Sequence, residues 1–183
     1  TRRSSDLILY ADDILLLAPS VTALQHLLHV CENELAYFDL AINAKKTACM
    51  RIGPRFNAEC INIVTHTGHE LKWTSKIRYL GVYLLNASTF KCCYSNAKKS
   101  FYKTFNSIFG KIGRTASEKV VLRLVQSKCM PAMLYGMDAC PVTRSQGNSL
   151  DLAVMGACMK IFNTRSKEVV TECMTMFGFF ICG

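Results

Sequence analysis

The sequence reads LILYADDILLL over residues 7–17, and this stretch is the clearest indication of the fold class. Two apolar runs, residues 7–10 and 14–17, stand on either side of a short polar gap. Continuous apolar runs of this length are typical of strands that are covered on both faces, and the gap suits a tight turn. We therefore predict a β-hairpin with Asp12 and Asp13 at its tip, and Pro19 ends the second strand.

The two adjacent carboxylates are the first candidates for chemistry. Side chains of neighbouring strand residues normally point to opposite faces, but this alternation breaks at a turn, so both carboxylates can converge on one spot. Two close carboxylates repel each other, and a cation between them removes that repulsion. Oxygen ligands of this kind suit Mg²⁺. The alternative is an ordinary acidic turn, since Asp is frequent in turns.

The chain that follows the hairpin begins with a helix and then has β texture. Ser20 is a suitable N-cap for a helix that runs to about Phe38. Short strands are expected next, the last of them with Gly81 inside it; they cover residues 48–52, 61–64, 71–73 and 77–85.

From about residue 88 the pattern is helical. The spacing of apolar residues from Tyr94 to Ile112 makes one stripe, with Lys99 and Lys103 on the opposite face. Ser117 can cap the next helix, which Pro131 is expected to break or end. A last helix is predicted over residues 150–162. The fold class is therefore α+β, followed by an all-α part.

Composition limits the possible functions. Half of the 183 residues are hydrophobic, which permits a core and excludes long disorder. No apolar run reaches the length of a membrane span, and Asp12 and Asp13 interrupt the one stretch that looks like the core of a signal peptide. We therefore expect an intracellular piece of a longer chain without a targeting segment, in the nucleus or the cytoplasm.

Ten cysteines and four histidines raise the question of disulfides and metals. The cysteines lie among apolar residues and form no C-x-x-C motif, so we expect buried, reduced thiols. The histidines form two H-x-x-H pairs, His26/His29 and His66/His69. No further ligand stands at a regular spacing from either pair, so the spacing does not predict a metal site.

The net charge of +9 is concentrated in one stretch. Residues 91–128 hold nine basic groups and a single acidic one, Glu118, whereas the basic and acidic groups of the remaining chain nearly balance. Such a block attracts polyphosphate, although a solvated helix face would have the same composition.

Four motifs follow one another along the chain: YADD, AINAKKT, RYLGV and MPAMLYG. In this order they resemble the reverse transcriptases of non-LTR (LINE-type) retrotransposons. The first is YADD at residues 10–13. It is followed by AINAKKT at residues 41–47, similar to the family's L-x-N-x-x-K-T segment, and by RYLGV at residues 78–82, similar to the primer grip. The last is MPAMLYG at residues 130–136, similar to a thumb helix. The resemblance implies the C-terminal part of a polymerase palm over residues 1–88 and a helical thumb and connection over residues 89–183.

The resemblance also implies roles for single residues. Asp12 and Asp13 would bind Mg²⁺, or Mn²⁺ in its place, for RNA-templated DNA synthesis from deoxynucleoside triphosphates. The incoming nucleotide and the primer would meet a second set of residues, namely Tyr10, Ala11 in a strained turn position, Lys46, Leu80 and Gly81. Phosphates of the RNA template and DNA primer would meet the basic residues of the thumb, namely Lys98, Lys99, Lys103, Arg114 and Lys119. The remainder of a parent polyprotein would be a further partner, and no membrane would be involved.

One departure from the family bears on activity. Reverse transcriptases use a third carboxylate on a strand that precedes the hairpin, and Asp6 cannot replace it, because six residues of extended strand span roughly 20 Å. We therefore expect an incomplete and inactive chain. Two alternatives remain: a non-catalytic nucleic-acid-binding remnant of a retroelement, and a scaffold or interaction protein that binds no nucleic acid.

Overall fold

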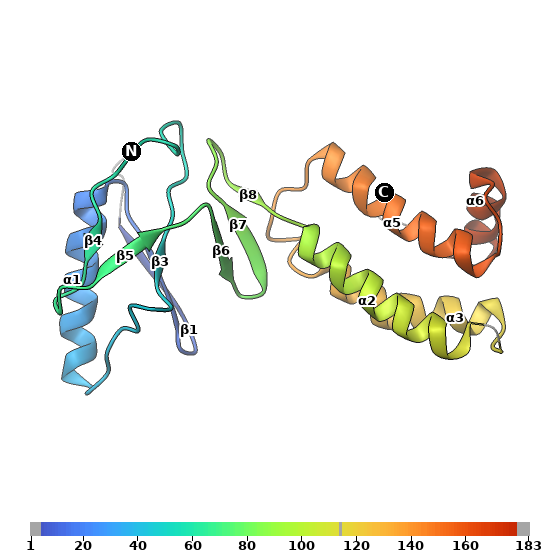
Figure 1. Ribbon diagram of the computed structural model, residues 1–183, viewed down its shortest axis with the longest axis horizontal. Coiled ribbons are helices and arrows are strands. Elements are labelled where there is room, and N and C mark those ends of the chain that lie inside the picture. Colours follow the sequence, from blue (N-terminus) through green and yellow to red (C-terminus); the bar gives the residue numbers. More distant parts are fainter. Residues whose placement is uncertain (1–4, 114, 179–183) are drawn as a thin grey trace. The chain divides into compact units, whose positions relative to one another are not determined.

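The computed structural model describes residues 5–113 and 115–178, and it combines helices with small sheets (Figure 1). The α+β class is therefore confirmed. The chain divides into two compact units. We call residues 1–77 and 85–90 the N-terminal unit, and residues 78–84 and 91–183 the helical unit.

The N-terminal unit begins with the predicted hairpin, β1 (Asp6–Tyr10) and β2 (Asp13–Leu17), which form a two-stranded antiparallel sheet. Helix α1 (Val21–Tyr37) follows, and the Ser20 hydroxyl accepts a hydrogen bond from the Ala23 amide, as expected of an N-cap. A second sheet has the order β3-β5-β4, built from β3 (Ala48–Cys49), β4 (Ile63–Val64) and β5 (Glu70–Trp73). Helix α1 packs on β2 and β4.

Residues 77–85, predicted as one strand with Gly81 inside it, form two strands instead. Strands β6 (Lys76–Tyr79) and β7 (Val82–Leu85) are joined by Leu80 and Gly81, and β8 (Lys91–Cys92) completes this sheet in the order β6-β7-β8. The sequence pattern does not predict this turn, because residues 79–83 are apolar or aromatic apart from the glycine, as in a continuous strand.

The helical unit contains α2 (Ser95–Ile112), α3 (Glu118–Leu124), the π-helical segment η1 (Val125–Cys129), α4 (Met130–Leu134), α5 (Arg144–Ile161) and α6 (Lys167–Met176). Helix α2 lies beside α5 in Figure 1 and packs on it. The predicted stripe faces the core, where Phe101 and Phe105 are almost fully buried.

Pro131 is predicted to break or end the helix that follows Ser117, but the chain stays helical through it. Proline lacks an amide hydrogen and clashes with the carbonyl of the preceding turn in a regular helix. Here the wider π-helical turn η1 precedes it, and Pro131 lies at the start of α4. The sequence pattern does not predict helix α6, and α5 begins at Arg144, earlier than expected.

Candidate functional site

The tip of the β1–β2 hairpin carries the two candidate metal ligands. Tyr10 pairs with Asp13, so Ala11 and Asp12 form a two-residue turn. Ala11 has a φ of +51°, a conformation in which a non-glycine residue costs about 1–2 kcal/mol. The expectation of a strained turn position at Ala11 is therefore confirmed. Asp6 pairs with Leu17 at the far end of the hairpin.

The hairpin is much more exposed than its apolar sequence predicts. Leu9 is 63% exposed and Tyr10 is 61% exposed, and both carboxylates at the tip are exposed. The prediction of strands covered on both faces is wrong for β1, which pairs only with β2 in the described part of the chain. An apolar sequence shows that a strand is suited to burial, but it does not show which other segment packs on the strand.

A second strained turn lies in the helical unit. Leu80 and Gly81 have φ values of +46° and +82°, and positive φ at both central residues is typical of a type I′ hairpin turn. Glycine adopts this conformation readily, whereas leucine does not. The Tyr135 hydroxyl donates a hydrogen bond of 3.0 Å to the Leu80 carbonyl, which holds this turn.

The segments RYLGV and MPAMLYG are therefore in direct contact. A Cβ atom added at Gly81 would lie 3.0 Å from the Tyr135 ring, and one added at Gly136 would lie 2.5 Å from a Val82 methyl group. Gly136 itself has a φ of +76°. Glycine is needed at both positions because the two segments approach so closely.

Lys46 lies in a turn of the N-terminal unit and is exposed. The turn is held by Asn43, whose backbone and side-chain oxygens accept the Lys46 amide at 3.0 and 3.3 Å. The backbone at Lys46 is thus held while its side chain is exposed to solvent.

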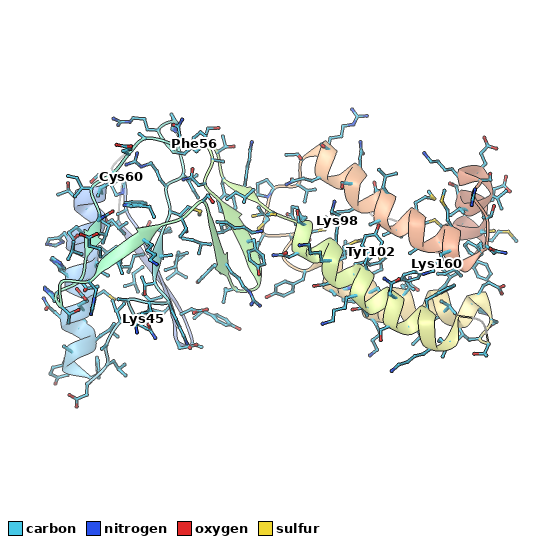
Figure 2. All side chains as sticks on the ribbon, in the orientation of Figure 1. Lys45, Phe56, Cys60, Lys98, Tyr102 and Lys160 are labelled. Carbon is cyan, nitrogen blue, oxygen red and sulfur yellow. The ribbon has the colours of Figure 1, made fainter. Side chains whose placement is uncertain are left out.

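The predicted phosphate-binding residues differ in their surroundings. Lys99, Lys103 and Lys119 are exposed. Lys98, labelled in Figure 2, is half-buried instead and donates a 2.7 Å hydrogen bond to the Ser149 hydroxyl, so α2 uses it to contact α5. Arg114 lies outside the described residues.

Two further cations were missed by the sequence reasoning. Arg123 lines a hollow of about 350 Å³, together with Lys119, Leu122, Gln126, Met176 and Phe177. Lys160, also labelled in Figure 2, places its ammonium 4.9 Å from the centre of the Phe109 ring. Arg123 stands four residues after Lys119, a spacing that puts both on one helix face and could have identified it.

The cysteines within the described residues are free thiols. Burial raises the pKa of Cys49 and Cys158 to about 11. Burial, with the neighbouring Cys140 thiol as a smaller cause, raises the pKa of Cys92 to about 12. These thiols stay protonated at neutral pH, so they are poor nucleophiles.

Comparison with protein families gives one match. Residues 1–84 match the family model of reverse transcriptase (RNA-dependent DNA polymerase). The matched part includes the β1–β2 hairpin, α1 and the Leu80-Gly81 turn. No curated protein and no solved structure is significantly similar to the chain. In addition, no helix within residues 5–113 and 115–178 is long and apolar enough to cross a membrane.

Proposed function

We propose that the chain is part of an RNA-directed DNA polymerase of the non-LTR (LINE) type, which copies RNA into DNA during retrotransposition. One observation carries the proposal. Among the described non-glycine residues with positive φ, Asp39 and Asn163 are of types that tolerate this conformation. The other two, Ala11 and Leu80, stand at the tips of the two hairpins that carry the YADD and primer-grip motifs. Local strain of this kind is concentrated at functional sites.

The donor set at the first tip fits a hard divalent cation. Asp12 and Asp13 offer exposed carboxylate oxygens, and Mg²⁺ is typically bound by one or two carboxylates, with waters and substrate phosphates as its other ligands. Bound Mg²⁺, or Mn²⁺ in its place, would stabilise the attacking 3′-hydroxyl and the leaving pyrophosphate of nucleotidyl transfer. The strained turn holds the two carboxylates at one tip.

The remaining roles follow the motifs. Tyr10 lies beside the carboxylates and is 61% exposed, where it can pack against the incoming nucleotide or the primer end. Lys46 supplies a charge for the leaving pyrophosphate. Gly81 is exposed at the turn that Tyr135 holds and would contact the primer backbone there, although the Tyr135 ring fills the space of its missing side chain.

Residues 1–88 would be palm and residues 89–183 thumb and connection. Residues 78–84 pack with the helical unit, so the primer-grip turn would move together with the thumb.

A metal-binding experiment tests the carboxylate pair. Paramagnetic Mn²⁺ should broaden the amide resonances of residues 10–14 in the 183-residue chain, and Mg²⁺ should compete. Asp12→Asn with Asp13→Asn should abolish this effect, whereas Asp6→Asn, at the other end of the same hairpin, should leave it unchanged. Equal broadening in the double variant would refute the metal site.

The isolated chain is expected not to extend a primer. Within the described residues, no third acidic, histidine or cysteine side chain lies close enough to Asp12 and Asp13 to complete a three-ligand group. Template-dependent extension by this chain, abolished by Asp12→Ala, would contradict that expectation.

The second test concerns nucleic acid. Changing Lys99, Lys103 and Lys119 together to Glu should nearly abolish binding of primer–template duplex, because these exposed cations are the proposed phosphate-binding groups. The salt dependence should flatten by about one unit of slope for each lysine–phosphate ion pair that the variant can no longer form. Binding is measured by fluorescence anisotropy at several salt concentrations.

A matched control separates location from net charge. Changing Lys72, Arg165 and Lys167 to Glu alters the charge equally at exposed positions outside residues 91–128, and duplex affinity should fall much less. If both triple variants bind alike, the basic stretch is only a solvated surface. Affinity that does not respond to salt would favour the scaffold alternative.

A further inference from the structure

The fold brings together one histidine from each H-x-x-H pair. His29 lies in α1, Glu32 follows it by three residues on the same helix, and His66 lies in the turn between β4 and β5. One ligand atom of each of these three side chains lies within 4.8 Å of the other two. The two histidines are 37 positions apart in the sequence, so no local spacing could have predicted this cluster.

Hydrogen bonds hold the cluster in place from both sides. The Glu32 carboxylate accepts the His66 backbone amide at 3.0 and 3.3 Å. The Gln25 side chain pairs with the backbone of Val64 in both directions, accepting its amide at 2.8 Å and donating to its carbonyl at 2.6 Å. Helix α1 and strand β4 are therefore fixed to each other directly beside the two imidazole rings.

Each imidazole also has a backbone carbonyl near one ring nitrogen. The Val64 carbonyl lies 3.2 Å from Nε2 of His29, and the His29 carbonyl lies 3.4 Å from Nε2 of His66. A metal-bound histidine usually donates its second ring N–H to such a carbonyl, which sets its tautomer and orientation. If His29 keeps this hydrogen bond, Nδ1 is the nitrogen of its ring that would bind a metal.

Gln25 gives His29 an alternative partner when no metal is bound. Its Nε2 atom lies 2.7 Å from Nε2 of His29 and can donate to that nitrogen in the neutral ring. If the proton of the neutral His29 ring moves to Nε2, that nitrogen no longer accepts from Gln25 and donates to the Val64 carbonyl instead. Metal binding at His29 would therefore change the tautomer of the ring, and the ring would shift away from the Gln25 amide because two N–H donors repel each other at 2.7 Å.

We propose that His29, Glu32 and His66 bind a divalent transition-metal ion, with Zn²⁺ as the first candidate, and that the ion links α1 to the β4–β5 turn. Two imidazoles and one carboxylate suit this class of ion, whereas the all-carboxylate tip at Asp12 and Asp13 suits Mg²⁺. Three protein ligands leave at least one position for water. This inference is independent of the proposed polymerase function.

Binding requires a small contraction of the cluster. Ligands at about 2.0–2.2 Å from Zn²⁺ in tetrahedral geometry lie roughly 3.3–3.5 Å apart. The rings of His29 and His66 are stacked, with centroids 4.3 Å apart. His66 is exposed and lies in a turn, so its side chain can give up its 3.4 Å contact with the His29 carbonyl and rotate towards the ion, while the half-buried Glu32 stays in place.

The test is a Zn²⁺ titration of the reduced, metal-free 183-residue chain. Long-range ¹H–¹⁵N spectra of the histidine side chains should show shifts of the His29 and His66 ring nitrogens, with a change of the His29 tautomer, and none for His26 and His69. The ring-nitrogen shifts distinguish zinc bound at His29 and His66 from zinc bound to cysteine thiols. Excess Mg²⁺ should not displace the Zn²⁺ ion.

Variants give the second readout. Calorimetry should show at least a tenfold loss of Zn²⁺ affinity at this site for His66→Ala and for Glu32→Gln. His26→Ala and His69→Ala, which remove the other histidine of each pair, should bind as the parent does. Unshifted His29 and His66 rings, or equal losses in His66→Ala and His69→Ala, would show a histidine stack with no metal role.

Discussion

The two units bury their apolar residues to very different extents. In the helical unit one continuous cluster joins residues of β8 and of every helix, with Phe101, Val125, Val154 and Val170 almost fully enclosed. In the N-terminal unit the described buried cluster consists of Leu28, Cys49, Ile63 and Leu71. The β1–β2 hairpin, by contrast, leaves large apolar side chains in solvent, namely Leu7, Ile8, Leu9, Tyr10 and Leu17.

Motif content and packing are therefore separate properties of the two units. The N-terminal unit holds the YADD tip and most of the family match, yet its first strand buries little. The helical unit lies mostly beyond the match, and its core is well packed. Because stability grows with the apolar area removed from water, we expect the helical unit to be the more stable of the two.

The largest expected effect is on the helical core. Phe101→Ala should destabilise the helical unit by about 3–5 kcal/mol, because truncating a fully buried ring leaves a cavity. Urea unfolding followed by far-ultraviolet circular dichroism should report this loss. The fluorescence of Trp73, the single tryptophan, reports the N-terminal unit, and its transition should not move.

The neighbouring residue provides the control. Tyr102 is 41% exposed on the same helix, and Tyr102→Ala should cost about 1 kcal/mol or less. A shift of both optical transitions with Phe101→Ala would show that the two units unfold as one, and the comparison would fail.

Alkaline pH should also separate the units. In the helical unit burial raises the pKa of the Cys92 thiol to about 12 and that of Cys158 to about 11, from an ordinary value of 9.0. Between pH 9.0 and the raised pKa, the unfolded chain releases thiol protons that the folded unit keeps. The free energy of unfolding is therefore unaffected by these thiols below pH 9 and falls as the pH rises above it. At pH 10, one unit above the ordinary pKa, each thiol should cost the fold roughly 1.4 kcal/mol.

The N-terminal unit has one thiol with a comparable shift, Cys49, whose pKa burial raises to about 11. Urea titrations at pH 8 and pH 10 should therefore show a larger loss by circular dichroism than by Trp73 fluorescence. Cys92→Ala with Cys158→Ala should reduce the difference. Equal losses by both probes would mean that these thiols do not distinguish the units.

The smallest effect tests one cap in each unit. The Ser20 hydroxyl accepts the Ala23 amide at 3.1 Å, whereas Ser117, the N-cap of α3, makes no side-chain capping bond. Ser20→Ala should cost about 1 kcal/mol in the Trp73 transition, and Ser117→Ala should change neither transition measurably. A cost at Ser117 equal to that at Ser20 would show that the hydroxyl bond is not what stabilises α1.

Local features of the fold could be predicted from the sequence. The hairpin and its tip follow from two apolar runs around YADD, and α1 follows from Ser20 and its apolar spacing. The buried face of α2 follows from the stripe through Phe101 and Phe105. Each depends on interactions between residues that are close in the sequence, so a pattern of a few residues contains the information.

Other features depended on which distant segments meet. No short stretch of sequence shows that β1 pairs with β2 alone in the described part of the chain. The same holds for the π-helical turn that accommodates Pro131 and for the hydrogen bond from Lys98 to Ser149. The Tyr135 hydroxyl reaches a turn 55 residues earlier, and His66 reaches His29 and Glu32 across a strand.

Short-range patterns were thus enough to predict the hairpin, the helices with clear periodicity, and the residues that carry the family resemblance. Which apolar runs are buried, which lysines are exposed and which histidines lie together depended on the tertiary structure. The physical reason is that propensity and periodicity act over a few residues, whereas burial and ligand geometry depend on side chains that the chain brings together from far apart.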